Sequence, residues 1–367
     1  MSARARLRRS AAVALVSAIT AGSALLLTAC DPSAQATAPK PGSAAPAGTT
    51  GSPSAPGSAT PSASASSSGT PSAPASAPAT PSSPASAPAD RPTATPTEAA
   101  LNLTKGTGLT ISNGTRYVVM DGRTVDFGTV VRDLAWSPDG KHAAFIDGAG
   151  NLQTSNPDGS HKVLIAKAPT GVTWSHPTWQ VTTPDQFDKG RTNLIFTADD
   201  HGTLRLLRLP AQAGATPDVI SLNPYSDENP KLPPTTGNRW PSSTGAHGRI
   251  VYANKDDGQV YLRDDYLRQN GGPVTKGSQP AADDEGDLVF VRSVDGHSHI
   301  FASHLNQANP DVQDLTPGAV VDFTEPVISH DGRTVAFRGP DGIYTAPTRG
   351  GKPQKVSDTV GLPAFRS

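Results

Sequence analysis

The chain has 367 residues, with 31 basic and 32 acidic side chains, a formal net charge of −1 and a single cysteine. One cysteine excludes an internal disulfide framework, so the folded part must be stabilised by core burial alone. Four of the arginines lie within residues 1–29, and without them 27 basic and 32 acidic residues remain. This acidic balance argues against nucleic acid or an anionic membrane surface as a partner.

The N-terminus has the organisation of an export signal. Four arginines among the first nine residues precede the apolar run AAVALVSAITAGSALLL, the basic and apolar regions of a secretory signal. The run ends in LTAC at residues 27–30, which resembles the lipobox of bacterial lipoproteins. We expect residues 1–29 to be a lipoprotein signal peptide and Cys30 to carry the lipid, which would place the protein on the extracytoplasmic face of the cell membrane. A signal anchor is the alternative, and the route of export, Sec or Tat, stays open.

Residues 30–100 are expected to be a disordered linker that begins at the lipidated cysteine. From Pro41 to Ala89 only Pro, Gly, Ser, Ala and Thr occur, so no large apolar side chain is present to offset the entropy of ordering. As extended polyproline the 70 residues after Cys30 would reach about 220 Å, and as a flexible coil about 50 Å. The linker is either a stalk that holds a domain away from the membrane or a passive tether.

Residues 101–367 show the pattern of an all-β domain, because short strand signals alternate with turns rich in Gly, Asp and Asn. The stretch LAWSPDGKHAAFIDGAGNLQTSNPDG, Leu134 to Gly159, is a typical unit. We expect its strands, with their flanking residues, at 133–136, 142–146, 152–155 and 161–165. Asp-Gly pairs suit the hairpins between them, since Gly accepts a positive φ and Asp caps its own turn.

This four-strand unit recurs along the chain. With the tryptophan of the first copy as reference, the equivalent positions are 136, 179, 240, 282, 328 and 365. Four strands per repeat, none able to bury both faces alone, are typical of a β-propeller blade. The segment Leu109 to Phe127 supplies only three strands, and Leu362 to Phe365 supplies one. We therefore predict a six-bladed β-propeller, closed by pairing of the C-terminal strand with the N-terminal blade, which removes two sheet edges.

Two copies of the repeat carry a family resemblance. The runs WSPDGKHAAF, Trp136 to Phe145, and SHDGRTVAF, Ser329 to Phe337, resemble the WD40/PD40-type repeat of TolB-like propellers. Together with the lipobox and the Ala/Pro-rich bias, they make the chain similar to actinobacterial propeller lipoproteins. The resemblance implies a fold rather than a function. The linker takes the place of the α/β domain of TolB, and residues 101–367 contain no G-x-S-x-G nucleophile elbow.

One series of residues is expected to lie near the central channel, three positions before each reference residue. It comprises Asp133, His176, Gly237, Gln279, Glu325 and Leu362. The four polar members, Asp133, His176, Gln279 and Glu325, are the predicted channel-lining residues. They could hold a divalent cation or a polar ligand, or simply form a solvated mouth. No cofactor is expected, and the sequence leaves a metal site open.

Two insertions and a group of histidines are further candidates. The connection from Ser221 to Arg239 is expected on the face of the channel entrance, and the insertion Gln180 to Arg191 on the opposite face. The predicted partner-binding residues of the first insertion are Tyr225, Asp227, Glu228, Arg239 and Trp240, unless the loop is only a tolerated insertion. The histidines His297, His299 and His304 suggest either a metal patch or a solvated strand face.

We therefore expect a membrane-anchored lipoprotein that acts as a non-enzymatic binding or scaffold propeller for an envelope protein. Two alternatives stay open at this point: a metal-dependent hydrolase or lactonase with its site in the channel, and a solute-binding or sensory lipoprotein.

Overall fold

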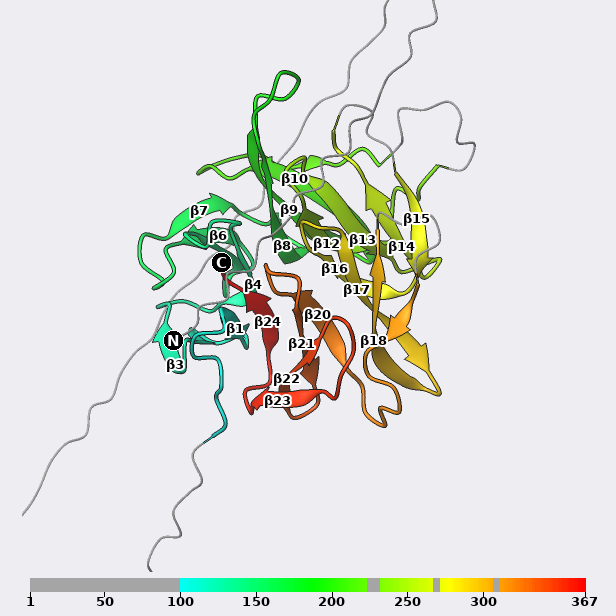
Figure 1. Cartoon of the computed structure of the whole chain (residues 1–367). Helices are drawn as coiled ribbons and strands as arrows, with labels where there is room; N and C mark the ends of the chain where they lie inside the picture. Colours follow the sequence, from blue (N-terminus) through cyan, green and yellow to red (C-terminus); the bar gives the residue numbers. More distant parts are fainter. Residues whose placement is uncertain (1–99, 223–231, 267–270, 306–310) are drawn as a thin grey trace, which may run out of the picture. The chain divides into compact units, whose positions relative to one another are not determined.

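The computed structural model describes residues 100–222, 232–266, 271–305 and 311–367. These residues form strands and turns without any helix, so none of them provides a helix that could cross a membrane. They build six antiparallel sheets of four strands each, arranged as the blades of a propeller (Figure 1). The prediction of an all-β, six-bladed propeller is confirmed.

The composite blade joins the two ends of the folded region. Its strand order from the centre outwards is β24-β1-β2-β3, with β24 at Leu362–Phe365, β1 at Leu109–Ser112, β2 at Tyr117–Met120 and β3 at Arg123–Asp126. All four residues of β24 pair with β1, from Leu109 opposite Phe365 to Ser112 opposite Leu362. The predicted closure by the strand Leu362–Phe365 is therefore confirmed, and the structure adds the register of the pairing.

The other five blades are continuous in sequence, and each runs from its inner strand to its outer strand. Blade 2 contains β4 (Arg132–Trp136), β5 (Ala143–Ile146), β6 (Leu152–Ser155) and β7 (Val163–Ala166). Blade 3 contains β8 (Val172–Thr182), β9 (Arg191–Asp200), β10 (Thr203–Pro210) and β11 (Asp218–Val219). Blade 4 contains β12 (Asn238–Thr244), β13 (Arg249–Asn254), β14 (Gln259–Arg263) and β15 (Gly271–Lys276). Blade 5 contains β16 (Ser278–Ala282), β17 (Asp287–Val294), β18 (His297–His304) and β19 (Gln313–Asp314). Blade 6 contains β20 (Thr324–Ile328), β21 (Thr334–Gly339), β22 (Gly342–Pro347) and β23 (Gln354–Ser357).

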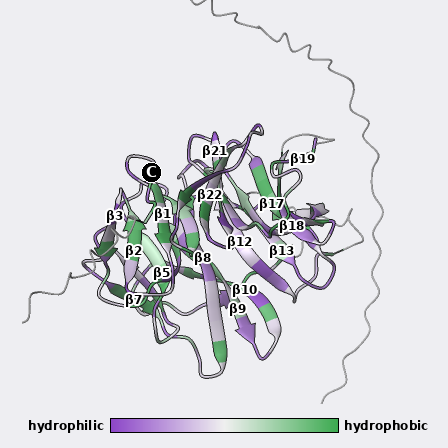
Figure 2. Cartoon of the chain, turned by 90° about the horizontal axis from the view of Figure 1, so that it is seen from below, coloured by the Kyte–Doolittle hydropathy of each residue, from purple (hydrophilic) through white to green (hydrophobic). Residues whose placement is uncertain are grey.

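The hydrophobic core lies between neighbouring blades. The described residues form six buried clusters, and each contains side chains from two adjacent blades. The cluster of Leu109, Ile111, Ala336 and Ile343 joins the composite blade to blade 6, so packing closes the ring as well as pairing. Figure 2 shows the same division, with hydrophobic residues in strands such as β17 and β2 and hydrophilic residues in the turns. A four-residue strand such as β5 is buried throughout because both of its faces pack against a neighbouring blade.

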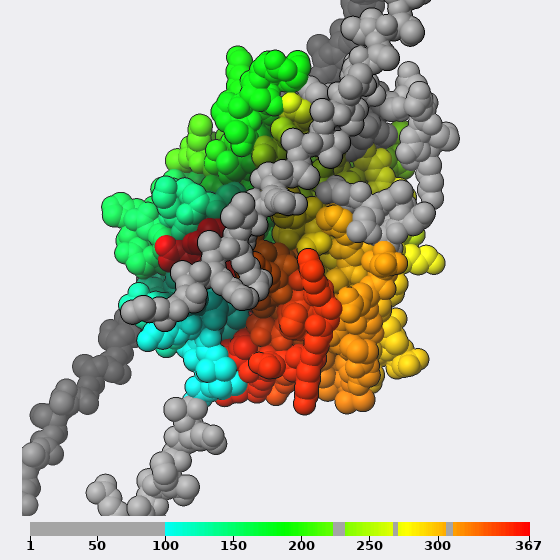
Figure 3. Space-filling model, viewed as in Figure 1, coloured from blue at the N-terminus to red at the C-terminus, as the bar shows by residue number. Residues whose placement is uncertain are grey.

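The first and last residues of the folded region are attached at different distances from the central axis. The C-terminal residues lie beside the first strands of the folded region, as the adjacent red and cyan-to-teal atoms in Figure 3 show. Just beyond β24, the Arg366 N–H donates to Gly108 O at 2.8 Å and its Nε–H donates to Gly140 O at 2.8 Å. At the other end, Leu103 N donates to Val356 O at 2.8 Å and Asn102 forms an isolated bridge with Ser357. Residues 101–103 thus border the outer strand of blade 6, a contact that the repeat pattern does not predict.

Candidate functional site

A bulge in each inner strand positions the candidate site. In each of the five continuous blades the inner strand has a β-bulge, where two of its residues lie opposite one residue of the neighbouring strand. The first residue of each bulge has a φ of 50–54°, a conformation that non-glycine residues rarely adopt. These residues are Asp133, His176, Trp240, Gln279 and Glu325. All five line one cavity of about 200 Å³ on the central axis.

The four predicted channel-lining residues therefore do meet in one cavity, but the fourth blade requires a correction. Trp240, rather than Gly237, occupies the bulge position of blade 4. Gly237 precedes β12, donates its N–H to Leu204 O at 2.9 Å and does not line the cavity. The repeat spacing selects Gly237 because it treats Trp240 as the equivalent of Trp136, whose side chain is buried in the core.

A sequence signal for the correct alignment was available. A proline follows the channel position in blades 3 to 6 and in the composite blade: Pro177, Pro241, Pro280, Pro326 and Pro363. Counting from these prolines instead of from the tryptophans would have selected Trp240. Leu362 takes this position in the composite blade, but it pairs with Ser112 in regular register and presents an apolar side chain to the cavity.

The five bulge residues form a ring around the cavity. Two of their side chains also hold neighbouring blades together. Asp133 Oδ2 accepts a hydrogen bond from the His176 N–H at 3.0 Å, which joins blade 2 to blade 3. Gln279 Oε1 accepts from the Glu325 N–H at 2.7 Å, which joins blade 5 to blade 6. Because these bonds end on the backbone of the bulges, they fix the positions from which the next side chains project. The ring is consequently a preorganised surface.

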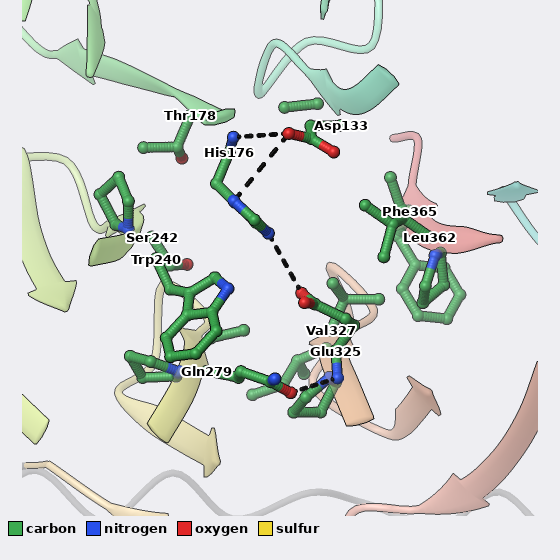
Figure 4. Close-up of a pocket in the computed structure, with 18 of the residues that line it drawn as sticks. Asp133, His176, Thr178, Trp240, Ser242, Gln279, Glu325, Val327, Leu362 and Phe365 are labelled. Atoms are coloured by element: carbon green, nitrogen blue, oxygen red, sulfur yellow. Dashed lines mark hydrogen bonds and ion pairs between the residues drawn. The ribbon is translucent and has the colours of Figure 1, made fainter. Parts of the chain in front are cut away.

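His176 lies between two carboxylates from different blades (Figure 4). Its Nδ1 is 3.9 Å from Asp133 Oδ2, and its Nε2 is 3.5 Å from Glu325 Oε2. The side chain of His176 is 27% exposed, and those of Asp133 and Glu325 are 16% and 22% exposed. Burial by itself lowers the pKa of His176, but the contact with Glu325 and the charge of Asp133 outweigh it and raise the pKa above 6.5.

Trp240 brings an aromatic face to the same ring. The guanidinium of Arg239 stacks over the indole, with 3.7 Å between its central carbon and the ring centroid. The rings of Trp240 and His176 meet edge to face at 6.1 Å between centroids. Burial lowers the pKa of Arg239, against the opposing charges of Glu325 and Asp256. The mouth of the channel therefore combines two acids, an imidazole, an amide and a stacked Arg–Trp pair.

The other predicted site residues and the two insertions lie outside the cavity or outside the described residues. Cys30 and the loop residues Tyr225, Asp227 and Glu228 lie outside the described residues, so their predicted roles stay predictions. The insertion after β8 is shorter than expected, because β8 runs to Thr182 and β9 begins at Arg191. It joins the C-terminal end of an inner strand, whereas the connection that ends at Arg239 joins the N-terminal end of one.

The three histidines of β18 do not act together. His299 is buried and its Nδ1 lies 2.8 Å from Asp314 Oδ2, while His304 Nδ1 lies 3.1 Å from Asp287 Oδ1. His299 therefore does not belong to a solvated strand face, and each of these two histidines has a carboxylate of its own. Within the ranges that the structure describes, no group of three or more His, Cys, Asp and Glu side chains is arranged to hold a metal ion.

The raised pKa of His176 predicts a pH-dependent stability. A group whose pKa is higher in the folded state stabilises that state fully below its unfolded pKa, near 6.5, and loses this contribution as the pH rises through the folded value. The free energy of unfolding should therefore fall more steeply between mildly acidic and mildly alkaline pH in the parent chain than in a His176→Gln variant. Urea denaturation at several pH values measures both slopes, and equal slopes would contradict the prediction.

Strand order and cavity together define the class of this protein, a six-bladed β-propeller with a polar central site. Comparison of the sequence with family models and with curated proteins gives no match. Among solved structures, the chain is similar to a protein described as TolB from Agrobacterium tumefaciens, with a TM-score of 0.48, 19% identity, and coverage of 69% of this chain and 89% of that one. It is also similar to TolB from Acinetobacter baumannii, with a TM-score of 0.49, 15% identity, and coverage of 70% and 65%. The structural neighbours thus include the TolB propellers that the repeat resembles, and the likeness concerns the fold alone.

Proposed function

We propose that this protein is a non-enzymatic binding propeller that engages an envelope protein at the mouth of its channel. The observation that carries the proposal is the ring of five bulged residues, which aims Asp133, His176, Trp240, Gln279 and Glu325 into one cavity. Five blades each adopt a rare backbone conformation at the same position. Such strain typically persists where it orients side chains for recognition.

The chemistry of the ring suits a protein segment as ligand. Trp and Arg are the residue types most often found as anchors in protein interfaces, and here they are stacked and partly buried. A cavity of about 200 Å³ admits a side chain or the tip of a loop. The adjoining acids favour a partner that brings a basic or hydrogen-bond-donating group into the mouth.

The proposed location rests on the N-terminal sequence. The basic and apolar regions followed by LTAC favour export and lipidation at Cys30, and the segment from Pro41 to Ala89 would then separate the propeller from the membrane. In this arrangement the protein touches the membrane only through its lipid, and its partner belongs to the envelope.

A pull-down from membrane and cell-wall extract tests the proposal, with the full chain as bait and mass spectrometry as readout. We expect one near-stoichiometric protein, whose recovery falls at least about tenfold with Trp240→Ala because an interface anchor is lost. Arg123→Ser, an exposed change on an outer strand, is the control and should retain the partner. Equal recovery with Trp240→Ala and Arg123→Ser would contradict the proposed site.

A small polar solute is the second candidate, because the cavity volume also fits a compact molecule. If no protein is captured, a screen of polar solutes for an increase in Tm separates this alternative. An increase that disappears in Glu325→Gln would assign the cavity to a solute.

A further inference from the structure

A second acidic site lies away from the channel, in the turn that follows β16. Asp283 is 9% exposed, and its Oδ1 accepts hydrogen bonds from the backbone N–H groups of Glu285, Gly286 and Asp287 at 3.1, 2.9 and 2.8 Å. These three bonds hold the turn. The second carboxylate oxygen, Oδ2, is buried and has no hydrogen-bond partner among the described residues. A buried carboxylate oxygen without a donor costs free energy, so it calls for a partner.

A different turn, between β5 and β6 of blade 2, shows how this chain satisfies a buried aspartate. Asp147, also buried, accepts from the N–H groups of Ala149 and Asn151 through Oδ1 at 2.8 and 2.9 Å. Its Oδ2 accepts from the side-chain amides of Asn151 and Gln153, at 3.3 and 2.6 Å. The same chain thus supplies amide donors where a buried aspartate closes a turn. At Asp283 Oδ2, none of the residues that the structure describes supplies such a donor.

A second carboxylate, that of Asp287, lies near Asp283 Oδ2 instead. A Cβ atom placed on Gly332, in the turn after β20, would lie 2.7 Å from Asp283 Oδ2 and 3.8 Å from Asp287 Oδ2. Both carboxylates therefore face the same point across the boundary of blades 5 and 6. They line an open groove of about 890 Å³, to which Glu285 and Asp331 and the cationic or ionisable side chains of His304, Arg333 and Arg349 also contribute. His304 Nδ1 lies 3.1 Å from Asp287 Oδ1, which leaves Asp287 Oδ2 on the side of Asp283. Burial, and next the charge of Asp287, raise the pKa of Asp283.

Comparison with two other blades shows that the turn itself does not need the charge of Asp283. The carboxylate of Asp284 accepts from Gly245 N at 2.7 Å, so it joins the turn to blade 4. In the corresponding turns of blades 2 and 6 the position of Asp283 is taken by Ser137 and Ser329, whose hydroxyls accept from the N–H groups of His142 and Thr334. A hydroxyl therefore suffices to close the turn, and the extra carboxylate oxygen points to a ligand.

We propose that Asp283 and Asp287 bind a divalent cation, calcium by preference, at the junction of blades 5 and 6. Calcium takes oxygen ligands in irregular geometry and completes its shell with water, whereas magnesium requires a regular octahedron. Two carboxylates and water make a weak site, with a Kd on the order of 10⁻⁴ to 10⁻³ M. The bound ion would hold Asp283 and Asp287 of blade 5 together beside the Gly332 turn of blade 6, and it would satisfy Asp283 Oδ2.

Thermal unfolding of the full chain, freed of metal by a chelator, tests this site. Addition of calcium chloride to about 10 mM, at constant ionic strength, should raise Tm by several degrees, since a ligand of the folded state stabilises it. Asp283→Asn keeps Oδ1 for the turn but removes the charge. We expect it to lose the calcium response, to weaken calcium binding at least about tenfold in calorimetry, and to melt no lower than the parent chain without calcium.

Asp284→Asn is the matched control, because it alters the adjacent acid that already has a backbone partner, and it should keep the response. If Asp283→Asn does not fold, Asp287→Asn carries the same expectation of a lost response. A parent chain whose Tm does not change with calcium would overturn the proposal. An unchanged response in Asp283→Asn or Asp287→Asn would overturn it equally.

Discussion

Deletion of residues 362–367 is expected to abolish the cooperative unfolding of the propeller. The deletion removes β24, whose four residues pair with β1 and whose Ala364 and Phe365 belong to the clusters on either side of the composite blade. It leaves β1 as an open edge and exposes apolar residues of two blades, a combination that favours aggregation. Far-UV circular dichroism during heating and size-exclusion chromatography measure the result.

The control for this deletion is the chain lacking only Ser367. This residue donates through Oγ to Pro138 O at an exposed position, so its loss should leave Tm nearly unchanged. Melting of the six-residue deletion within a few degrees of the parent chain, with a monomeric elution volume, would show that β24 is not required for closure. A peptide of residues 361–367 should restore cooperative melting to the deleted chain when added in excess.

The largest effect of a single substitution is expected at Asp265. Its side chain is completely buried, and Oδ2 accepts from Arg191 Nη1, Arg208 Nη1 and Gln180 Nε2 at 3.0, 2.8 and 3.1 Å. Oδ1 accepts from Arg263 Nη2 at 2.8 Å. One carboxylate thus compensates three guanidinium groups, of which that of Arg263 is only 3% exposed.

Asp265→Ala should lower the free energy of unfolding by about 3–5 kcal/mol, because it leaves buried positive charge without compensation. Urea denaturation monitored by tryptophan fluorescence gives this difference directly. The matched control is Asp126→Ala, which breaks a solvent-exposed pair with Arg116 and should change the unfolding midpoint little. Similar losses in both variants would contradict the assigned role of burial.

The sequence predicted the blades well because local signals define them. Asp-Gly turns and short apolar runs located β6 at Leu152–Ser155 and β24 at Leu362–Phe365 as the structure has them. The missing strand of the first blade and the surplus strand at the end predicted closure, since a propeller leaves few unpaired edges. The predicted strands agree with the structure because each hairpin pairs two strands that follow one another in the chain.

The site was less predictable, because its geometry depends on bulges. Asp133, His176 and Glu325 were selected by spacing, but the positive φ that turns them into one cavity has no residue-type signature. The repeat spacing places Trp240 beside a loop for partner binding, whereas the proline that follows it and the register shift in β12 place it in the ring.

The buried charge cluster was not predicted at all. In the sequence, Arg263 and Asp265 look like ordinary polar residues of a turn. Their burial arises because β10, β14 and the start of β9 bring three arginines to a single carboxylate. Such a convergence depends on tertiary packing, and no local pattern reports it.

The contact of residues 101–103 with blade 6 has a mechanical consequence. Leu103 N donates to Val356 O in the outer strand, and Asp358 N, just after that strand, donates to Leu101 O. Tension transmitted along the preceding chain therefore acts first on the rim of blade 6. It reaches β1 only after this short contact has peeled away. The pairing of β1 with β24 is thus shielded from load, and a pull on the N-terminal side extends a few residues before it can open the ring.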